Sequence, residues 1–391
     1  MRNYLLLSVM TLSLLHAASP LSPEKRHLLD LKRQQQDAES TKLKNSWIAP
    51  LRLSASWQRN VNAGNFDGTT TNASLRLNQD IFRSGGIWYA VDYAKALGEA
   101  QALGIDIEEA RELEQLYRLK IQLERDGLKL KQAKLTRKNR EIDADVVRER
   151  YKSGDADISE LSRVMLQVDQ AENQIITLEN ALESERLELQ KLYGAKPLEK
   201  LRLPAMPLVD KEDYLARNME LLRYRKQIAS DKAKYKTVRA SYLPKLSVSG
   251  NYGYSKFRGD FQNYDGDEYG YGITFSIPLD YNMPKDIEAN KIAWLANKVA
   301  AKDRKNELEK EYEKHRLAIE AAQKKIGVAK RMTKRYDALY RFTKAEYRAG
   351  TKTSYDVASL KNALEIEKLE EKIQQRNILL EKVAIFFAMK R

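Results

Sequence analysis

Two proline-free segments, each more than 60 residues long, limit what this chain can fold into. They run from Ala90 to Arg150 and from Asp286 to Glu346 and are rich in Ala, Leu, Lys, Glu and Gln. At a rise of about 1.5 Å per residue, each would form a helix about 90 Å long. Because such a helix far exceeds the usual globular length, both segments predict coiled-coil packing.

Shorter helical segments lie beside them in the sequence. Glu160–Leu192 has apolar residues at steps of three and four, interrupted by Glu185, and Ser354–Lys390 continues such a seam in two phases that slip near Leu364. The two others are Ser22–Lys44 and Lys211–Ser241. From their lengths we expect Glu160–Leu192 to stack end to end on Lys211–Ser241, and Ser354–Lys390 on Ser22–Lys44.

Four segments instead alternate apolar and polar residues with the period of a β-strand. They form two pairs, 50–82 and 245–279, and each pair is divided by a stretch rich in Gly, Asn, Asp or Thr. Period-two alternation around a turn-rich linker predicts a β-hairpin. Pro50 and Pro244 stand just before the pairs, where proline can open a strand without breaking a ladder.

These strands have the length and the aromatic residues of membrane strands. Roughly ten residues suffice for a tilted transmembrane strand, and Trp and Tyr favour membrane interfaces. Four strands cannot close a barrel, and lipid tolerates no open sheet edge. A membrane location therefore requires two copies with eight strands or three with twelve, and the residues alone do not decide between these numbers. The alternative is a soluble sandwich with an aromatic core.

The composition of the chain argues against most kinds of metal-binding and catalytic site. The chain has no Cys and three His, which excludes zinc and disulfide frameworks, so we expect no cofactor. No nucleophile elbow, phosphate loop or metal cluster is visible, and the carboxylates lie beside Lys and Arg, so an enzyme is the least favoured class. The net charge of +14 comes from 69 basic and 55 acidic residues that are interspersed. That pattern favours solvated helix faces over a nucleic-acid surface.

The first 18 residues differ from the rest. A short basic start, an apolar run from Tyr4 to Leu15 and small residues near Ala18 are typical of a secretory signal peptide over 1–18. The alternative is a buried N-terminal helix. A secreted, highly charged chain without cysteine suggests a bacterial envelope protein.

Two similar motifs indicate an internal duplication. "YKSGDADISE" (151–160) and "YRAGTKTSYD" (347–356) are 196 residues apart, each at the end of a long helical segment. We therefore divide the chain into repeats 19–203 and 204–391, each with a half-helix, a hairpin, a long helix, a tip (151–159 or 347–354) and a second half-helix. Gly154 and Gly350 suit the reversal of a helical hairpin. Side chains that could cap the following helices are Asp157 or Ser159 and Thr353 or Ser354.

With both motifs in register, the chain resembles the TolC-like outer-membrane efflux proteins over nearly its full length. "SYLPKLSVSGNYGYS" (241–255) is similar to that family's helix-to-strand junction, and "YRAGTKTSYDV" (347–357) to its helical tip. The resemblance implies a mainly α protein with a membrane β-barrel: a homotrimer with four strands per protomer, a twelve-stranded barrel in the outer membrane and a long antiparallel coiled-coil tunnel in the periplasm.

The resemblance also implies partners and a function. The tunnel would dock on a periplasmic adaptor (membrane fusion) protein joined to an inner-membrane pump of RND, MFS or ABC type, and its barrel would contact outer-membrane lipid. The chain would be a passive exit duct that exports drugs or other toxic compounds. The alternatives are the outer-membrane component of a type I protein secretion system and, more remotely, a surface coiled-coil structural protein. The cargo is not encoded in any of these motifs.

Site residues carried over from the family lie in the tips. Asp356 matches an acidic position of the periplasmic gate, where three copies would form a cation-favouring ring. A second family Asp is replaced here by Ser359, which puts a two-ring gate in doubt, and Lys352 is either a gate partner or a solvated loop lysine. The resemblance also implies a set of adaptor-docking residues in the two tips, for which turn formation and helix capping are the alternative roles. They are Gly154, Asp155, Asp157, Ser159, Gly350, Thr351, Thr353 and Ser354.

Overall fold

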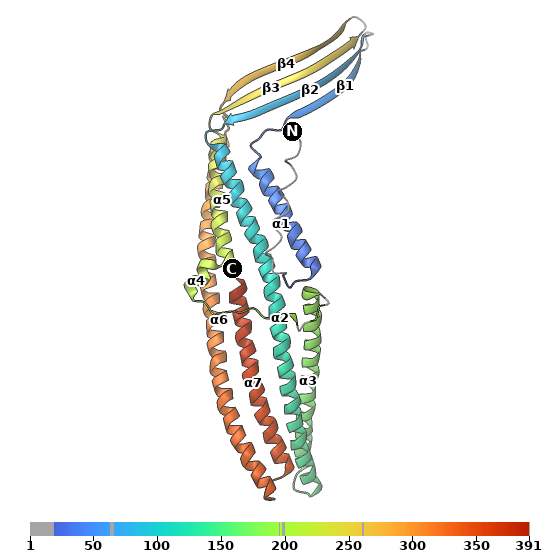
Figure 1. Cartoon of the computed structure of the whole chain (residues 1–391), viewed down its shortest axis with the longest axis vertical. Coiled ribbons are helices and arrows are strands. Elements are labelled where there is room, and N and C mark those ends of the chain that lie inside the picture. The colour runs from blue at the N-terminus through green and yellow to red at the C-terminus, as the bar shows by residue number, and fades with distance from the viewer. Residues whose placement is uncertain (1–18, 63–65, 195, 198–199, 260–261, 391) are drawn as a thin grey trace, which may run out of the picture. The chain divides into compact units, whose positions relative to one another are not determined.

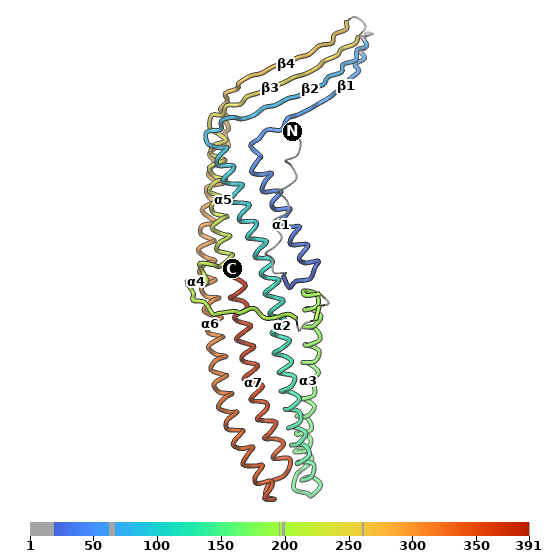
Figure 2. The backbone as a smooth tube through the Cα atoms, in the orientation of Figure 1, coloured from blue at the N-terminus to red at the C-terminus, as the bar shows by residue number. Residues whose placement is uncertain are grey.

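The computed structural model describes residues 19–62, 66–194, 196–197, 200–259 and 262–390 (Figures 1 and 2). The expected signal peptide, 1–18, lies outside the described residues. The elements are, in chain order, α1 (Pro23–Lys44), β1 (Arg52–Asn62), β2 (Phe66–Phe82), α2 (Gly86–Lys152), α3 (Ile158–Tyr193), α4 (Lys211–Arg217), α5 (Met219–Ser241), β3 (Lys245–Gly259), β4 (Asn263–Ser276), α6 (Met283–Arg348) and α7 (Ser354–Phe387).

The two long helices confirm the mainly helical architecture expected from the sequence, and the four strands confirm both predicted hairpins. Helix α2 has 67 residues and α6 has 66. The predicted helix Lys211–Ser241 is wrong as a single helix, because Asn218 is extended (ψ 122°) and divides it into α4 and α5. Asn218 pairs instead with Met389 as an isolated β-bridge. No helix in the described ranges is both long and apolar enough to cross a membrane.

The expected end-to-end pairing of the short helices is also wrong. The N–H of Ser22, just before α1, donates to Leu192 O at the end of α3 at 2.8 Å, and the N–H of Met219, at the start of α5, donates to Ala388 O after α7 at 3.0 Å. Residues 201–210 form neither helix nor strand, and ten extended residues reach about 33 Å. With so long a connection, α4 is not obliged to follow directly on α3.

The strands form one antiparallel sheet in the order β1-β2-β3-β4. Leu53 of β1 pairs with Leu75 of β2, Leu75 with Tyr252 of β3, and Tyr252 with Tyr269 of β4. Since pleated neighbours in register share a face, these residues belong to one side of the sheet. We call it the apolar face and the opposite side the polar face. In this sheet, β1 and β4 are the edge strands.

The chain divides into two compact units, and each combines segments from both halves of the sequence. The tip unit comprises residues 19–30, 106–219 and 306–390 as far as they are described, and the sheet unit comprises 31–105 and 220–305. In the tip unit, Ile121 of α2 packs with Val383 and Phe387 of α7 and with Met206. The ring of Phe387 also stacks on Tyr117 of α2, with 5.4 Å between centroids. These apolar contacts hold α7 against α2.

In the sheet unit, polar contacts join the ends of β2 and β3. Asp80 near the end of β2 accepts hydrogen bonds from Ser247 Oγ of β3 at 2.7 Å and from Arg83 Nε at 2.6 Å. Ser84 Oγ donates to Pro244 O at 2.7 Å. The chain turns into α2 through Ser84 and Gly85, both of which have a positive φ. The two strand–helix junctions are therefore fixed to each other.

Candidate functional site

The first helical tip is a tight reversal built on Gly154. Its φ of +85° lies in the left-handed region, where a side chain is strained. The N–H of Gly154 donates to Tyr151 O at 3.1 Å, and the N–H of Asp155 donates to Arg150 O at 2.8 Å. These bonds satisfy the last carbonyl groups of α2, as in other glycine-terminated helices.

Asp157 caps the helix that follows. Its Oδ1 accepts the N–H of Glu160 at 2.7 Å, and its backbone is extended, as expected for an N-cap. Ser159, the other candidate cap, lies inside α3. Arg150 fastens the turn further, because its guanidinium donates to Glu160 Oε1 at 2.9 Å and to Asp155 O at 3.0 Å.

The second tip repeats this geometry 196 residues later. Gly350 has a φ of +80°, and its N–H donates to Tyr347 O at 3.0 Å. Both the N–H and the hydroxyl of Thr351 donate to Glu346 O at 3.0 Å. Thr353 is the cap, since its Oγ1 accepts the N–H of Asp356 at 3.2 Å, whereas Ser354 is the first residue of α7.

Asp356, the expected gate residue, completes a capping box at this tip. Its Oδ2 accepts the N–H of Thr353 at 2.9 Å and the Thr353 hydroxyl at 2.8 Å. The hydrogen bonds from Thr353, assisted by the charge of Lys352, lower the pKa of Asp356. The carboxylate therefore carries a full charge at neutral pH while it holds the start of α7.

The two tips use their acidic residue differently for a simple reason. Glu160 and Asp356 are equivalent across the 196-residue offset, and so are Arg150 and Glu346. Glu160 pairs with the basic Arg150. The equivalent position in the second tip is acidic, and the carboxylate of Asp356 instead turns back to its own cap.

Asp356 and Ser359 also line a groove of about 490 Å³ in the tip unit. Its other lining residues come from α2, α3 and α7: Ile142, Asp143, Val146, Val147, Arg163, Val164, Gln167 and Tyr355. Lys352 is exposed and does not line it. The structure thus places two of the three expected gate residues together. Whether three copies form a ring stays a prediction.

The apolar face of the sheet is the second candidate region. The side chains of Leu53, Tyr269 and Tyr271 are 80%, 80% and 90% exposed, respectively. Trp57, Ile273 and Phe275 on the same face are also exposed. In the soluble sandwich considered as an alternative, a second layer would bury this face. No such layer covers these side chains in the described part of the chain.

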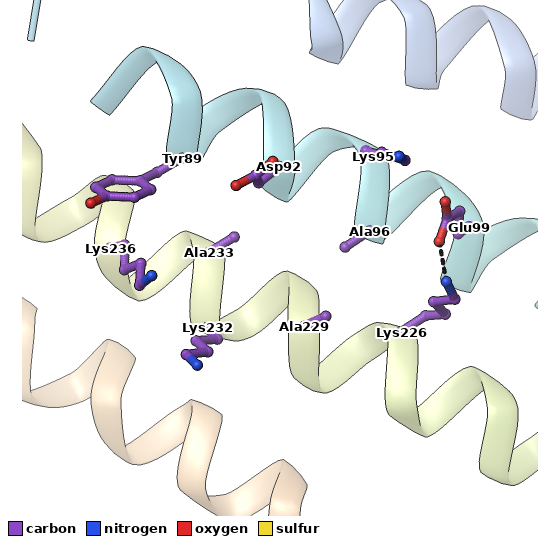
Figure 3. Close-up of a pocket in the computed structure, with 10 residues that line it drawn as sticks. All are labelled: Tyr89, Asp92, Lys95, Ala96, Glu99, Lys226, Ala229, Lys232, Ala233 and Lys236. Carbon is purple, nitrogen blue, oxygen red and sulfur yellow. Dashed lines mark ion pairs between the residues drawn. The ribbon is translucent and has the colours of Figure 1, made fainter. Parts of the chain in front are cut away.

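Sequence reasoning did not single out a groove between α2 and α5 in the sheet unit (Figure 3). It has a volume of about 320 Å³ and a floor that includes Ala96 and Ala233. Lys226 of α5 forms an ion pair with Glu99 of α2 at 2.5 Å, and Lys236 lies over the ring of Tyr89 at 5.1 Å. The spacing of small residues on α5 could have indicated close helix packing here.

A carboxyl pair in the tip unit was likewise missed as a pair. Asp126 of α2 is buried and lies close to Glu185, the polar interruption in the α3 seam. Among the described residues, no group of three or more acidic or histidine side chains could hold a metal ion.

With the tips and the sheet defined, the sequence can be compared with protein families. Residues 212–388, which include β3, β4, α6, α7 and the second tip, match the model of the family described as outer membrane efflux protein. This stretch, a little under half of the chain, is similar to the outer membrane efflux protein family. A comparison of the sequence with curated proteins finds no match.

Solved structures extend the similarity to nearly the whole fold. A membrane protein from Pseudomonas aeruginosa aligns with a TM-score of 0.72 at 14% identity, over 94% of each chain. The Campylobacter jejuni CmeC outer membrane channel gives 0.72 at 14%, over 94% of this chain and 84% of that one. VceC from Vibrio cholerae gives 0.71 at 14%, over 93% and 92%. The fold is therefore TolC-like, as the sequence motifs predicted.

Proposed function

We propose that this chain is one protomer of a homotrimeric outer-membrane channel, the passive exit duct of a tripartite efflux pump. The observation that carries the proposal is a sheet with an uncovered apolar face and two edge strands. An apolar face of this kind is stable against lipid acyl chains.

The sheet edges support assembly of several copies. Each open edge in lipid would leave backbone groups unpaired at a cost of several kcal/mol each. Pairing of β4 of one copy with β1 of the next removes both edges. Two copies give eight strands with a filled interior, whereas three give twelve with room for a lumen. We favour three copies because a duct requires a lumen.

The helical tips are the proposed contact with the pump. Both end in exposed turns with backbone geometry fixed by Gly154 and Gly350. In this proposal the tips lie in the periplasm and contact an adaptor protein that joins the channel to an inner-membrane pump. Asp356 and Lys352 would contribute to closure at the same end. The channel itself performs no chemistry. It conducts small toxic compounds that the pump delivers.

The assembly is tested by purifying the protein in detergent and measuring its mass and conductance. We expect a trimer by native mass spectrometry, with single-channel currents in planar lipid bilayers. A water-soluble monomer without conductance would refute the proposal. A second test places Cys at Thr351 and, as a control, at Asn263 in the sheet. Crosslinks to an adaptor in cells are expected from Thr351→Cys alone, and crosslinks from Asn263→Cys alone would refute the orientation.

A further inference from the structure

Two arginines lie directly opposite each other on the polar face of the sheet. Arg52 of β1 pairs in register with Arg76 of β2, and the row continues through Asn251 of β3 to Gly270 of β4. Directly opposed residues have their Cβ atoms about 5 Å apart, and like charges in such a pair are destabilising. The sheet therefore holds two positive charges at a position that it would not favour for folding alone.

Nothing in the described part of the chain neutralises this pair. Neither Arg52 nor Arg76 forms a hydrogen bond or an ion pair there, and both side chains are exposed. Asp80, on the same face, is engaged by Ser247 and Arg83. Glu268, also on this face, lies on β4, two strands away from Arg76.

The arginines also line a hollow with neutral hydrogen-bonding groups around it. Its volume is about 450 Å³, and its lining includes the side-chain amides Asn78 and Asn251. In the adjacent strand, Gly270 faces the same side and makes room for the Asn251 side chain, whose Oδ1 would lie 2.6 Å from a Cβ added at Gly270. Each guanidinium group presents a fork of N–H donors that matches the geometry of a carboxylate or a phosphate.

We propose that Arg52 and Arg76, with Asn78 and Asn251, form a binding subsite for an oxyanion, a carboxylate or phosphate group, on the polar face of the sheet. The inference rests on the proposed function, in which the polar face lines the lumen. Three copies would place six guanidinium groups around one level of the barrel. Such a ring favours anions over cations and selects compounds that carry an acidic group.

The test uses the full-length protein in planar lipid bilayers. Reversal potentials in a KCl gradient report ion preference, and added inorganic phosphate or citrate reports block by each kind of oxyanion. We expect the wild type to prefer chloride and to be blocked by at least one of the two. The variant Arg52→Gln/Arg76→Gln should lose the chloride preference and bind the blocking anion about tenfold or more weakly.

Two further variants separate a binding subsite from a general positive field. Arg52→Lys/Arg76→Lys keeps the charge but loses the fork geometry, so it should keep the chloride preference while block weakens. Arg59 lies on the same strand as Arg52 but on the opposite face of the sheet, where it forms an ion pair with Asp67. The control variant Arg59→Gln should therefore behave as the wild type.

The outcomes distinguish this inference from the proposed function. A wild type that inserts but gives no currents refutes the channel itself. A conducting wild type that neither anion blocks, or a conducting Gln double variant with unchanged selectivity and block, overturns the subsite and leaves the channel proposal standing. Conductance and trimer mass of each variant establish that it has folded.

Discussion

Glu185 of α3 lies close to Asp126 of α2, so two carboxyl groups meet in the tip unit, and Glu185 Oε2 is buried without a hydrogen-bond partner among the described residues. Burial raises the pKa of Asp126, but hydrogen bonds from Arg125 and Lys129 outweigh it and lower that pKa to about 2. Burial and the contact with Asp126 raise the pKa of Glu185 to about 7. The pair therefore holds one proton, on Glu185, below neutral pH.

This pair predicts that the tip unit loses stability as the pH rises toward neutral. The pKa of Glu185 is above its ordinary value of 4.5, so the folded state binds more protons than the unfolded state between that value and about 7. Its contribution is complete below this window and is lost as the pH rises through about 7. Glu185→Gln keeps a neutral hydrogen-bonding side chain, so it should melt a few degrees above the wild type at about pH 8 but not at about pH 5.

The measurement is thermal unfolding in detergent, followed by far-UV circular dichroism. Glu183→Gln is the matched control, because Glu183 lies on the same helix, is exposed and contacts only Arg186 at 3.6 Å among the ion pairs described. We expect no difference between the two pH values for that control. Parallel melting of Glu185→Gln and the wild type at both pH values would contradict the assignment.

We predict that glycine is required at both tips because of the backbone conformation there, and not because a larger side chain would clash with its neighbours. No described atom lies within 4 Å of a Cβ added at Gly154 or Gly350, but both have a positive φ. Alanine there should cost about 1–2 kcal/mol of unfolding free energy. Gly127, inside α2, is equally unobstructed and has no positive φ, so Gly127→Ala should stabilise by up to about 1 kcal/mol. Denaturant unfolding of the three variants measures this difference, and equal effects would refute it.

These comparisons show how far the sequence could lead. The 196-residue offset located both reversals, because a glycine after a long periodic helix has few other roles. It could not choose between Asp157 and Ser159, since both are good caps and only the backbone angle decides. It could not reveal that Ser22 contacts Leu192, because helix lengths do not encode which ends meet. Glu185 was visible as a seam defect, but its partner Asp126 lies on another helix and has no sequence signal.

Asp356 has two roles to separate, the observed cap and the proposed gate. Thr353→Ala removes the cap hydroxyl but keeps the carboxylate, and it should cost about 1 kcal/mol without changing ion selectivity. Asp356→Ala should cost a similar amount and also raise conductance or shift the reversal potential further toward chloride, because it removes negative charge at the tip. Because the cap lowers the pKa of Asp356, its stabilising contribution should be lost only as the pH falls below the ordinary value of 3.8.

Unfolding curves and single-channel recordings of both variants separate the two roles. If Thr353→Ala changes selectivity as much as Asp356→Ala, the effect comes from the geometry of the tip and not from a charged ring. If neither variant changes selectivity or block by divalent cations, Asp356 is a cap only.

The assignment of the two sheet faces makes a prediction for neighbouring residues of one strand. Leu53 lies on the apolar face and is 80% exposed, while Ser54 lies on the polar face and contacts Ser74 Oγ at 2.9 Å. Arginine on a lipid-facing strand position costs about 2–4 kcal/mol at the bilayer midplane, whereas a lumen position tolerates charge. Leu53→Arg should therefore reduce the yield of folded, heat-modifiable protein in lipid vesicles, and Ser54→Arg should not. Because the two substitutions add the same side chain one residue apart, a reversed result would mean that the polar face is the one in contact with lipid.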